Sequence, residues 1–234
     1  MADKGPIVFI ISHNRPIYLW VTLDSLYRKT VGNCRFILID NKSTDTLIYD
    51  VINSFSYRGM FHKKYLMEEN DVNNLRKVFK EQDDIGDYHF LIESDVEVLT
   101  HNWNNIMYKY FTSDNYGFLG SAVDKSDFVD LSGDEKNGNN IFLTKTESPE
   151  RSYPLDGEGV IDVIPPGRLT IRKTQVVRDS IDTIHRDSQL TQFTKDAGYM
   201  TGLIRDVKHR HLSLLNYYDY NGYSQNERDN FFNN

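Results

Sequence analysis

Several features that mark common protein classes are missing from this 234-residue sequence. The single cysteine, Cys34, excludes an internal disulfide, which is consistent with a reducing compartment. Acidic residues outnumber basic ones by 34 to 27, and the net charge of −7 lacks the basic field that nucleic-acid binding needs. We therefore expect no nucleic-acid partner. Residues 1–6 are polar and show no signal peptide or membrane anchor, so we expect a cytoplasmic protein without a transmembrane segment.

Two glycine-rich phosphate-binding patterns are also missing. No Gly-x-Gly-x-x-Gly follows the first apolar run, Ile7 to Ile11, which argues against a dinucleotide cradle. No Gly-x-x-x-x-Gly-Lys occurs either, which argues against a Walker-type ATP site. A nucleotide bound to this chain would therefore be held by side-chain carboxylates and a metal ion.

The length and composition favour one folded domain, because hydrophobic residues make up 39% and charged residues 26% of the chain. Apolar runs of strand length alternate with amphipathic segments of helical period. The predicted strands are 7–11, 35–39, 65–67, 88–92, 169–171 and 199–207. The predicted helices are 17–28, 46–55, 72–82, 102–111, 174–184 and 187–197. This alternation predicts an α/β fold with a parallel sheet and helices on both sides.

Three of the predicted strands run into polar or acidic loops. These loops are Ser12 to Arg15, Asp40 to Asp45 and Glu93 to Glu97. Ligands of open parallel α/β sheets bind beyond the carboxyl ends of the strands. We therefore expect the three loops to lie together at one edge of the sheet and to form the functional site.

The strongest chemical signal is the stretch from Phe90 to Val98, which changes from an apolar strand to an acidic segment. Glu93, Asp95 and Glu97 would share one face if this strand stayed extended. A core strand cannot bury unpaired charges at low cost, so the carboxylates must face water, a cation or a ligand. Converging carboxylates suit Mg²⁺ or Mn²⁺, which typically carries a substrate phosphate. The alternative is an acidic junction on the protein surface.

The order and spacing of these blocks resemble family 2 glycosyltransferases and their GT-A relatives. The resemblance covers Ile7 to Asp45, with Ser12-His13-Asn14-Arg15-Pro16 and Ile39-Asp40-Asn41, and then Leu91 to Val98 as an Asp-x-Asp-like segment. It implies a GT-A type α/β fold, a single Rossmann-like domain with a mostly parallel mixed central sheet flanked by helices. This domain would cover residues 1–212, with a nucleotide-sugar-binding half (1–120) and an acceptor-binding half (121–212), followed by a C-terminal tail (213–234). It also implies transfer from a nucleotide-sugar donor, a UDP-sugar, to a hydroxyl of a glycan or other acceptor. Inversion is expected, although the residues alone leave the stereochemistry open.

The resemblance assigns nucleotide contacts to Ser12, His13, Asn14, Arg15, Asp40, Glu93 and Ser94. Asp40 would hydrogen-bond the base, and Glu93 or Ser94 the ribose. From the residues alone, Asp40 equally fits a turn in which its carboxylate holds its own loop. In this interpretation the metal ligand is Asp95. His209 would complete the metal shell, with His211 as the alternative.

The acceptor hydroxyl must lose a proton as it attacks, and a carboxylate within hydrogen-bond reach can accept it. The resemblance assigns this role to Asp187, at a predicted helix start. An Asp at that position also suits an N-cap. Asp156 and Glu158, in a glycine-containing loop, are alternative bases, and Tyr153 is a candidate for stacking on a sugar.

Two other functions remain open from the sequence. A sugar-1-phosphate nucleotidyltransferase would share the fold, but it would need a glycine-rich loop with a basic residue after the first strand, which is missing. A non-catalytic nucleotide-sugar or glycan-binding module could retain the same fold. UDP-sugar turnover with and without Mn²⁺ separates such a module from an enzyme.

Overall fold

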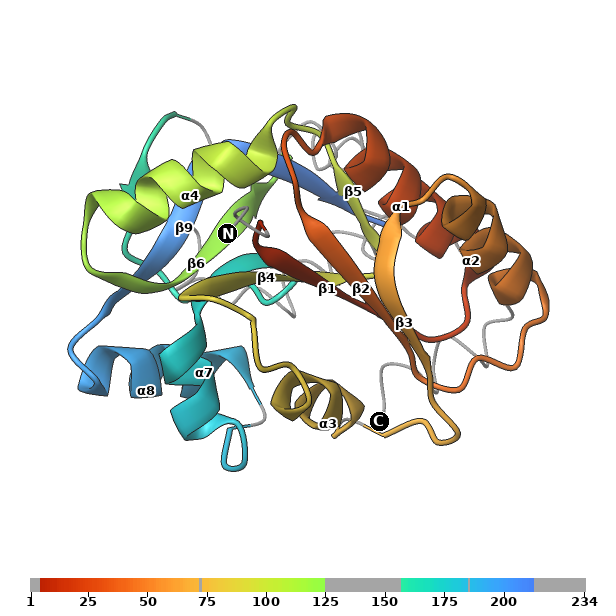
Figure 1. Ribbon diagram of the computed structural model, residues 1–234. Coiled ribbons are helices and arrows are strands. Elements are labelled where there is room, and N and C mark those ends of the chain that lie inside the picture. The colour runs from red at the N-terminus through yellow and green to blue at the C-terminus, as the bar shows by residue number, and fades with distance from the viewer. Residues whose placement is uncertain (1–4, 72, 125–156, 185, 213–234) are drawn as a thin grey trace, which may run out of the picture.

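The computed structural model describes residues 5–71, 73–124, 157–184 and 186–212, which form one sheet with helices on both faces (Figure 1). The strands are β1 (Ile7–Ser12), β2 (Arg35–Asp40), β3 (Phe61–Leu66), β4 (Tyr88–Glu93), β5 (Val96–Val98), β6 (Tyr116–Val123), β7 (Val160–Ile161), β8 (Leu169–Lys173) and β9 (Met200–His211). The helices are α1 (Pro16–Lys29), α2 (Leu47–Tyr57), α3 (Asn74–Lys80), α4 (Trp103–Ser113), α7 (Thr174–Ser180) and α8 (Asp187–Asp196).

The sheet is mixed and mostly parallel. Its strand order is β3-β2-β1-β4-β8-β6-β9-β5, and β7 pairs with β9 outside this series. β3, β2, β1 and β4 are parallel, β8 runs antiparallel between β4 and β6, and β9 is parallel to β6. Six of the nine described strands therefore run in one direction, which confirms the predicted sheet.

Helices cover both faces of the sheet, with α1, α2 and α4 on one side and α3, α7 and α8 on the other (Figure 1). Successive residues of β1 point to opposite faces, so Val8 packs in the larger core cluster and Phe9 in the smaller one. Phe90 and Trp103 meet edge to face in the larger cluster, with ring centroids 4.9 Å apart. A sheet buried on both faces explains the continuous apolar runs of the sequence.

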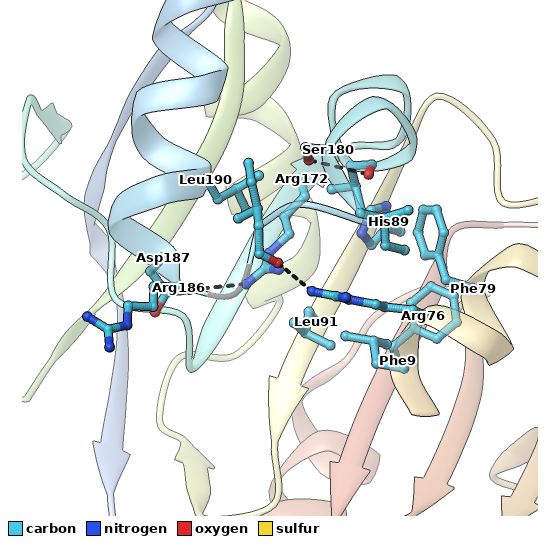
Figure 2. A pocket seen from close by; sticks show the side chains of 14 residues that line it. Phe9, Arg76, Phe79, His89, Leu91, Arg172, Ser180, Arg186, Asp187 and Leu190 are labelled. Carbon is cyan, nitrogen blue, oxygen red and sulfur yellow. Dashed lines mark hydrogen bonds and ion pairs between the residues drawn. The ribbon is translucent and has the colours of Figure 1, made fainter. Parts of the chain in front are cut away.

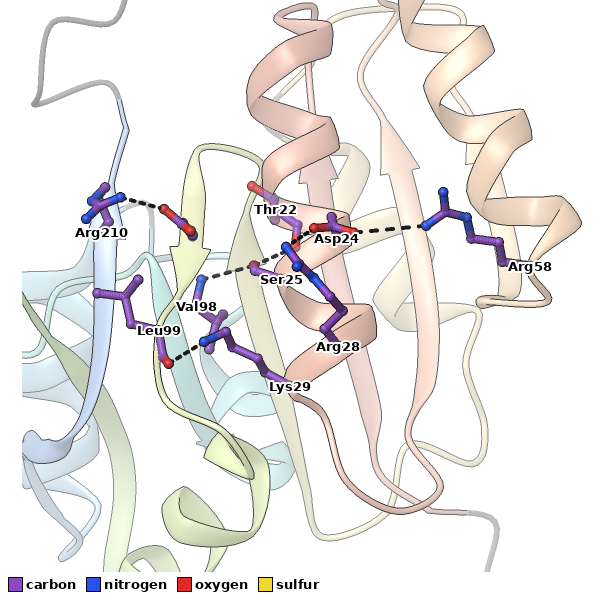
Figure 3. Close-up of polar contacts among 10 residues, drawn as sticks. Thr22, Asp24, Ser25, Arg28, Lys29, Arg58, Val98, Leu99 and Arg210 are labelled. Atoms are coloured by element: carbon purple, nitrogen blue, oxygen red, sulfur yellow. Dashed lines mark hydrogen bonds and ion pairs between the residues drawn. The ribbon is translucent and has the colours of Figure 1, made fainter.

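The edge strand β5 is secured by the first helix. The backbone N–H groups of Val96 and Val98 donate to the hydroxyl oxygens of Thr22 and Ser25, at 3.2 and 3.0 Å. Figure 3 shows the Val98–Ser25 bond between α1 and β5. These side chains occupy the ladder positions that another strand would use. The helix that follows the first loop thus holds the strand that follows the acidic segment.

Several elements differ from the prediction. β5, β6 and β7 were not predicted, β3 begins at Phe61 rather than at residue 65, and α7 ends at Ser180 rather than at residue 184. β9 continues to His211 instead of ending at residue 207, because β5 and β6 both pair with its polar end. His209 and His211 therefore lie within the last strand.

The predicted division between residues 120 and 121 stays a prediction, and β6 runs across that point. The predicted tail, 213–234, lies outside the described residues. Across the parts of the chain that the structure describes, every helix is too short or too polar to cross a bilayer.

Candidate active site

The three polar loops meet at one edge of the sheet, as predicted. In the parallel register, Ser12 lies beside Asp40 and Ile11 lies beside Glu93. The carboxyl ends of β1, β2 and β4 are therefore level with one another. This edge is where an open parallel sheet binds its ligands.

Asp40 joins the first two loops and is almost fully buried, with 1% of the residue exposed. Its Oδ1 accepts hydrogen bonds from the hydroxyls of Ser12 (2.8 Å) and Ser43 (2.5 Å), and its Oδ2 accepts one from the Ser43 backbone N–H (3.0 Å). The turn-forming interpretation of Asp40 is thus present in the structure. Its predicted contact with a nucleotide base stays a prediction.

His13, Asn14 and Arg15 form the rest of the first loop. His13 Nδ1 donates to the Asn41 carbonyl (2.7 Å), and Asn14 Oδ1 accepts from the Thr44 backbone N–H (2.7 Å). Asn14 and Arg15 have φ of 51° and 57°, in the left-handed region that non-glycine residues rarely adopt. Such backbone strain is a feature of functional loops. The first two loops therefore form one preorganised surface.

A second cluster lies where β4 gives way to β5. The Leu212 backbone N–H donates to the Asp95 carbonyl (2.8 Å), and Val96 pairs with His211 in the β5–β9 ladder. This pairing brings His211 Nε2 within 3.2 Å of Asp95 Oδ2, to which it donates a hydrogen bond. Glu93, Asp95 and His211 each offer a ligand atom, and these atoms lie within 4.8 Å of one another. They form the candidate metal site.

This donor set fits a divalent cation. Two carboxylates suit Mg²⁺ or Mn²⁺, and an imidazole ligand favours Mn²⁺ or another transition metal. Burial lowers the pKa of His211, an effect opposed by Asp95 and reinforced by the positive charges of Arg168 and Arg15. The lowered pKa favours the neutral imidazole, which is the form that binds a metal. Arg15 Nη1 also lies 3.5 Å from Asp95 Oδ2.

Glu93 remains accessible to solvent, yet protein groups surround its carboxyl. The pKa of Glu93 is raised to about 7. The largest cause is burial of the carboxyl, and the next is the negative charge of Asp95. Arg168 opposes this shift, and Asp187 adds to it. A metal ion bound between Glu93 and Asp95 would instead favour the charged carboxylate.

The strand does not stay extended beyond Glu93, so the three acidic residues do not share one face. The chain turns after Glu93, and Glu97 in β5 pairs with Arg210 at 3.0 Å, outside the cluster (Figure 3). Ser94 lies half-buried in the turn. His209 is fully buried and hydrogen-bonds Ser121 through Nδ1 (2.7 Å). Among the described residues, the ligand cluster contains His211 rather than His209.

Asp187 begins α8, at the helix start that the sequence predicted. Its Oδ1 lies 3.7 Å from Arg172 Nη2, and its carboxyl lies against the backbone of Gly167. Its charge also reaches Glu93, whose pKa it helps to raise. The structure therefore places the predicted base at the start of α8, close enough to Glu93 to act on it electrostatically.

The alternative residues lie elsewhere or cannot be placed. Glu158 lies next to β7, where its carbonyl accepts a hydrogen bond from Arg205 in the middle of β9. Asp156 and Tyr153 fall outside the described residues.

The sequence analysis did not select the β8 arginines. Arg168 precedes β8 and Arg172 lies within it, and both act electrostatically on Glu93. Their proximity follows from the antiparallel β4–β8 pairing, in which Ile92 lies opposite Leu169. The sequence analysis predicted a strand at 169–171 but gave no local signal that this strand pairs with β4.

Neither a protein-family model nor a curated protein matches this sequence. Solved structures do match. A mannosyltransferase from Pyrobaculum calidifontis, PcManGT, in complex with GDP-Man and Mn²⁺, has a TM-score of 0.62 and 13% identity over 90% of this chain and 58% of its own. TarS (1–349) from S. aureus, in complex with UDP-GlcNAc, has a TM-score of 0.58 and 14% identity over 89% of this chain and 60% of its own.

GalNAc-T7 with UDP, GalNAc and Mn²⁺ has a TM-score of 0.58 and 12% identity over 89% of this chain and 44% of its own. The chain thus spans less than two thirds of the length of each of these proteins. These likenesses show that the chain has the GT-A glycosyltransferase fold, as the sequence predicted.

Proposed function

We propose that this chain of GT-A glycosyltransferase fold transfers a sugar from a nucleotide-sugar to a hydroxyl group with the help of a divalent metal. The observation that carries the proposal is the Glu93, Asp95 and His211 cluster at the carboxyl edge of the sheet. Structural neighbours contain a nucleotide-sugar, Mn²⁺ or both, which supports the same chemistry here. We take a UDP-sugar as the donor, a glycan, glycoconjugate or other hydroxyl-bearing molecule as the acceptor, and inversion as the outcome.

The donor side of the site holds the nucleotide diphosphate. Asp95, His211 and Glu93 would hold the metal, which neutralises the charge that develops on the departing diphosphate. Arg15 lies beside Asp95 and supplies a fixed positive charge next to the same phosphates. The loop that Asp40 organises, with His13 and Asn14, provides the surface for the nucleoside.

On the acceptor side, Asp187 acts as the base. The acceptor oxygen forms a bond to the anomeric carbon while the bond from that carbon to the diphosphate oxygen breaks. The hydroxyl proton passes to the Asp187 carboxylate, and the nucleoside diphosphate leaves. Arg172, at 3.7 Å, holds the carboxylate in place for this transfer. A base on the side of the sugar opposite the diphosphate inverts the anomeric centre.

A nucleotide screen followed by a hydrolysis assay tests this function. UDP, GDP, dTDP and CMP are compared by thermal shift with and without Mn²⁺, because a ligand that binds the folded state raises its stability. We expect UDP with Mn²⁺ to give the largest shift. Metal-dependent hydrolysis of the corresponding sugar nucleotide is then measured in the wild type, in Asp95→Ala and in Glu97→Gln.

Glu97→Gln is the matched control, because Glu97 lies two positions from Asp95 but pairs with Arg210. We expect Asp95→Ala to lose metal-dependent turnover while folded and Glu97→Gln to keep it. Wild-type turnover in Asp95→Ala would remove Asp95 from the mechanism. Nucleotide binding without any turnover would instead identify a binding module.

A further inference from the structure

A cavity of about 310 Å³ lies on the sheet face covered by α3, α7 and α8 (Figure 2). Its walls are mainly apolar and include Phe9, Phe79, Leu91, Val177 and Leu190. This volume lies at the lower end of the range for small-molecule pockets, which predominantly have apolar walls and a few polar groups. The cavity therefore suits a small ligand with a compact apolar body.

Charged side chains gather around this apolar space. Arg76, Arg172 and Arg186 line the cavity, and Asp187 is the one acid among the described lining residues. Figure 2 shows Arg76 reaching from α3 toward the α7–α8 connection, where its Nη2 donates to the Ile184 carbonyl (2.8 Å). Three guanidinium groups against one carboxylate favour a ligand that carries a negative charge.

The cavity adjoins the candidate active site. His89, Leu91 and Glu93 alternate along β4 and face the same side of the sheet, so the cavity lies beneath the strand that ends at the metal cluster. Asp187 lines the cavity and also acts electrostatically on Glu93. A ligand in the cavity would therefore have its polar end next to the proposed base.

We propose that this cavity binds the acceptor, and that the acceptor is an aromatic or short aliphatic alcohol carrying a carboxylate or phosphate group. The apolar body fills the space beside Phe9, Leu91 and Leu190. The anionic group pairs with Arg172 of β8 and with the exposed Arg186 before α8, whose side chain turns inward from its position in Figure 2, and the hydroxyl reaches Asp187. This inference rests on the proposed function and specifies its acceptor.

The test uses mandelate, whose hydroxyl and carboxylate share one carbon, as the probe and uncharged 1-phenylethanol as its comparison. Binding of each is measured by ligand-observed NMR titration of the protein saturated with UDP and Mn²⁺. Leu190→Trp fills the cavity, and Arg186→Gln removes the positive charge of an exposed lining residue. The control is Arg28→Gln, at an exposed residue of α1 on the opposite face of the sheet.

We expect the carboxylate probe to bind the wild type about tenfold more tightly than the uncharged alcohol, because a carboxylate accepts charge-assisted hydrogen bonds from guanidinium groups. Leu190→Trp should abolish binding, Arg186→Gln should reduce the preference for the carboxylate, and Arg28→Gln should change neither. Equal affinity for the two probes, or no binding of either, overturns the proposal. So does unchanged binding in Arg186→Gln, a surface variant that remains informative if Leu190→Trp fails to fold.

Binding of UDP with Mn²⁺ is measured first on the same protein samples. If the protein binds UDP and Mn²⁺ but not the probe, only the acceptor assignment fails. If it does not bind UDP and Mn²⁺, the proposed function itself fails.

Discussion

The His211 imidazole lies 3.2 Å from the Asp95 carboxylate, although the two residues are 116 positions apart in the chain. The short strand β5 creates this proximity, because its pairing with β9 sets Val96 opposite His211. The first helix holds β5 in turn, through the hydroxyls of Thr22 and Ser25. The geometry of the candidate metal site therefore depends on an edge strand of three residues.

Replacing His211 should weaken metal binding, whereas replacing His209 should not. We expect His211→Ala to lower Mn²⁺ affinity about tenfold or more, since even outer-shell residues of metal sites cost 10–100-fold on mutation. His209→Ala should lower the stability of the fold, because it leaves a cavity and a lost hydrogen bond at Ser121. Mn²⁺ titration by electron paramagnetic resonance measures the affinity. Loss of affinity in His209→Ala alone would assign the ligand to His209.

A methyl group at Gly167 should disturb the proposed base. A Cβ built at Gly167 would lie 2.5 Å from Asp187 Oδ1, so Gly167→Ala must displace the carboxylate. We expect this variant to keep UDP–Mn²⁺ binding and to lose sugar transfer, as Asp187→Asn should. The measurement pairs nucleotide titration with transfer to an acceptor. Full transfer activity in both variants would place the base elsewhere.

His89 should make the protein less stable in mild acid. Burial, reinforced by the positive charges of Arg172 and Arg178, holds its pKa well below the ordinary 6.5. At pH values between that lowered pKa and 6.5, the unfolded chain binds more protons than the folded one. The contribution of His89 to stability is therefore complete above pH 6.5 and decreases as the pH falls below 6.5. The loss is at most about 1.4 kcal/mol per pH unit for one group.

The measurement is the free energy of unfolding from urea titrations between pH 7 and pH 5. We expect the pH slope to be smaller in His89→Asn, which keeps a polar partner for Thr174 and cannot take up a proton. Equal slopes in the two proteins would show that His89 does not titrate on unfolding in this range.

The framework of the site was predictable from local sequence. Apolar runs that end in polar residues placed Ser12, Asp40 and Glu93 at one edge, because parallel strands align their carboxyl ends. The start of α8 at Asp187 was equally local. These features depend on strand direction and on helix starts, both of which neighbouring residues largely determine.

The choice between two histidines was not local. His209 and His211 lie two positions apart in one strand, so they share a face. His209 pairs with Val98, and His211 pairs with Val96 next to the β4–β5 turn. This register decides which imidazole meets Asp95, and it joins segments more than 100 positions apart, which periodicity cannot reveal.

β6 was missed for a different reason. Its glycines lower strand propensity, yet they permit close packing. A side chain at Gly117 would meet Thr194 Cγ2 at 2.6 Å, and one at Gly120 would meet Pro165 Cβ at 3.0 Å. Glycine in this strand therefore reflects contacts with α8 and the segment before β8, which only the tertiary structure shows.

Replacing Asp40 should affect both stability and nucleotide binding. Asp40→Asn replaces one buried carboxylate oxygen with an amide NH₂ group. This group cannot accept the hydrogen bonds that Ser12 and Ser43 donate. We expect a loss of roughly 1–3 kcal/mol in unfolding free energy, the range for an unsatisfied buried polar group. UDP binding should weaken as the loop loosens. Ser12→Ala removes one of the same hydrogen bonds and should show a smaller effect on both quantities.

The central claim is that Glu93, Asp95 and His211 hold the metal that binds the diphosphate. An anomalous difference map at the manganese edge, from crystals grown with UDP and Mn²⁺, tests this claim most directly. We expect the strongest peak among the Glu93 and Asp95 carboxylates and the His211 ring, in contact with the UDP phosphates. A strongest peak remote from Asp95, or a diphosphate bound away from the peak, would contradict it.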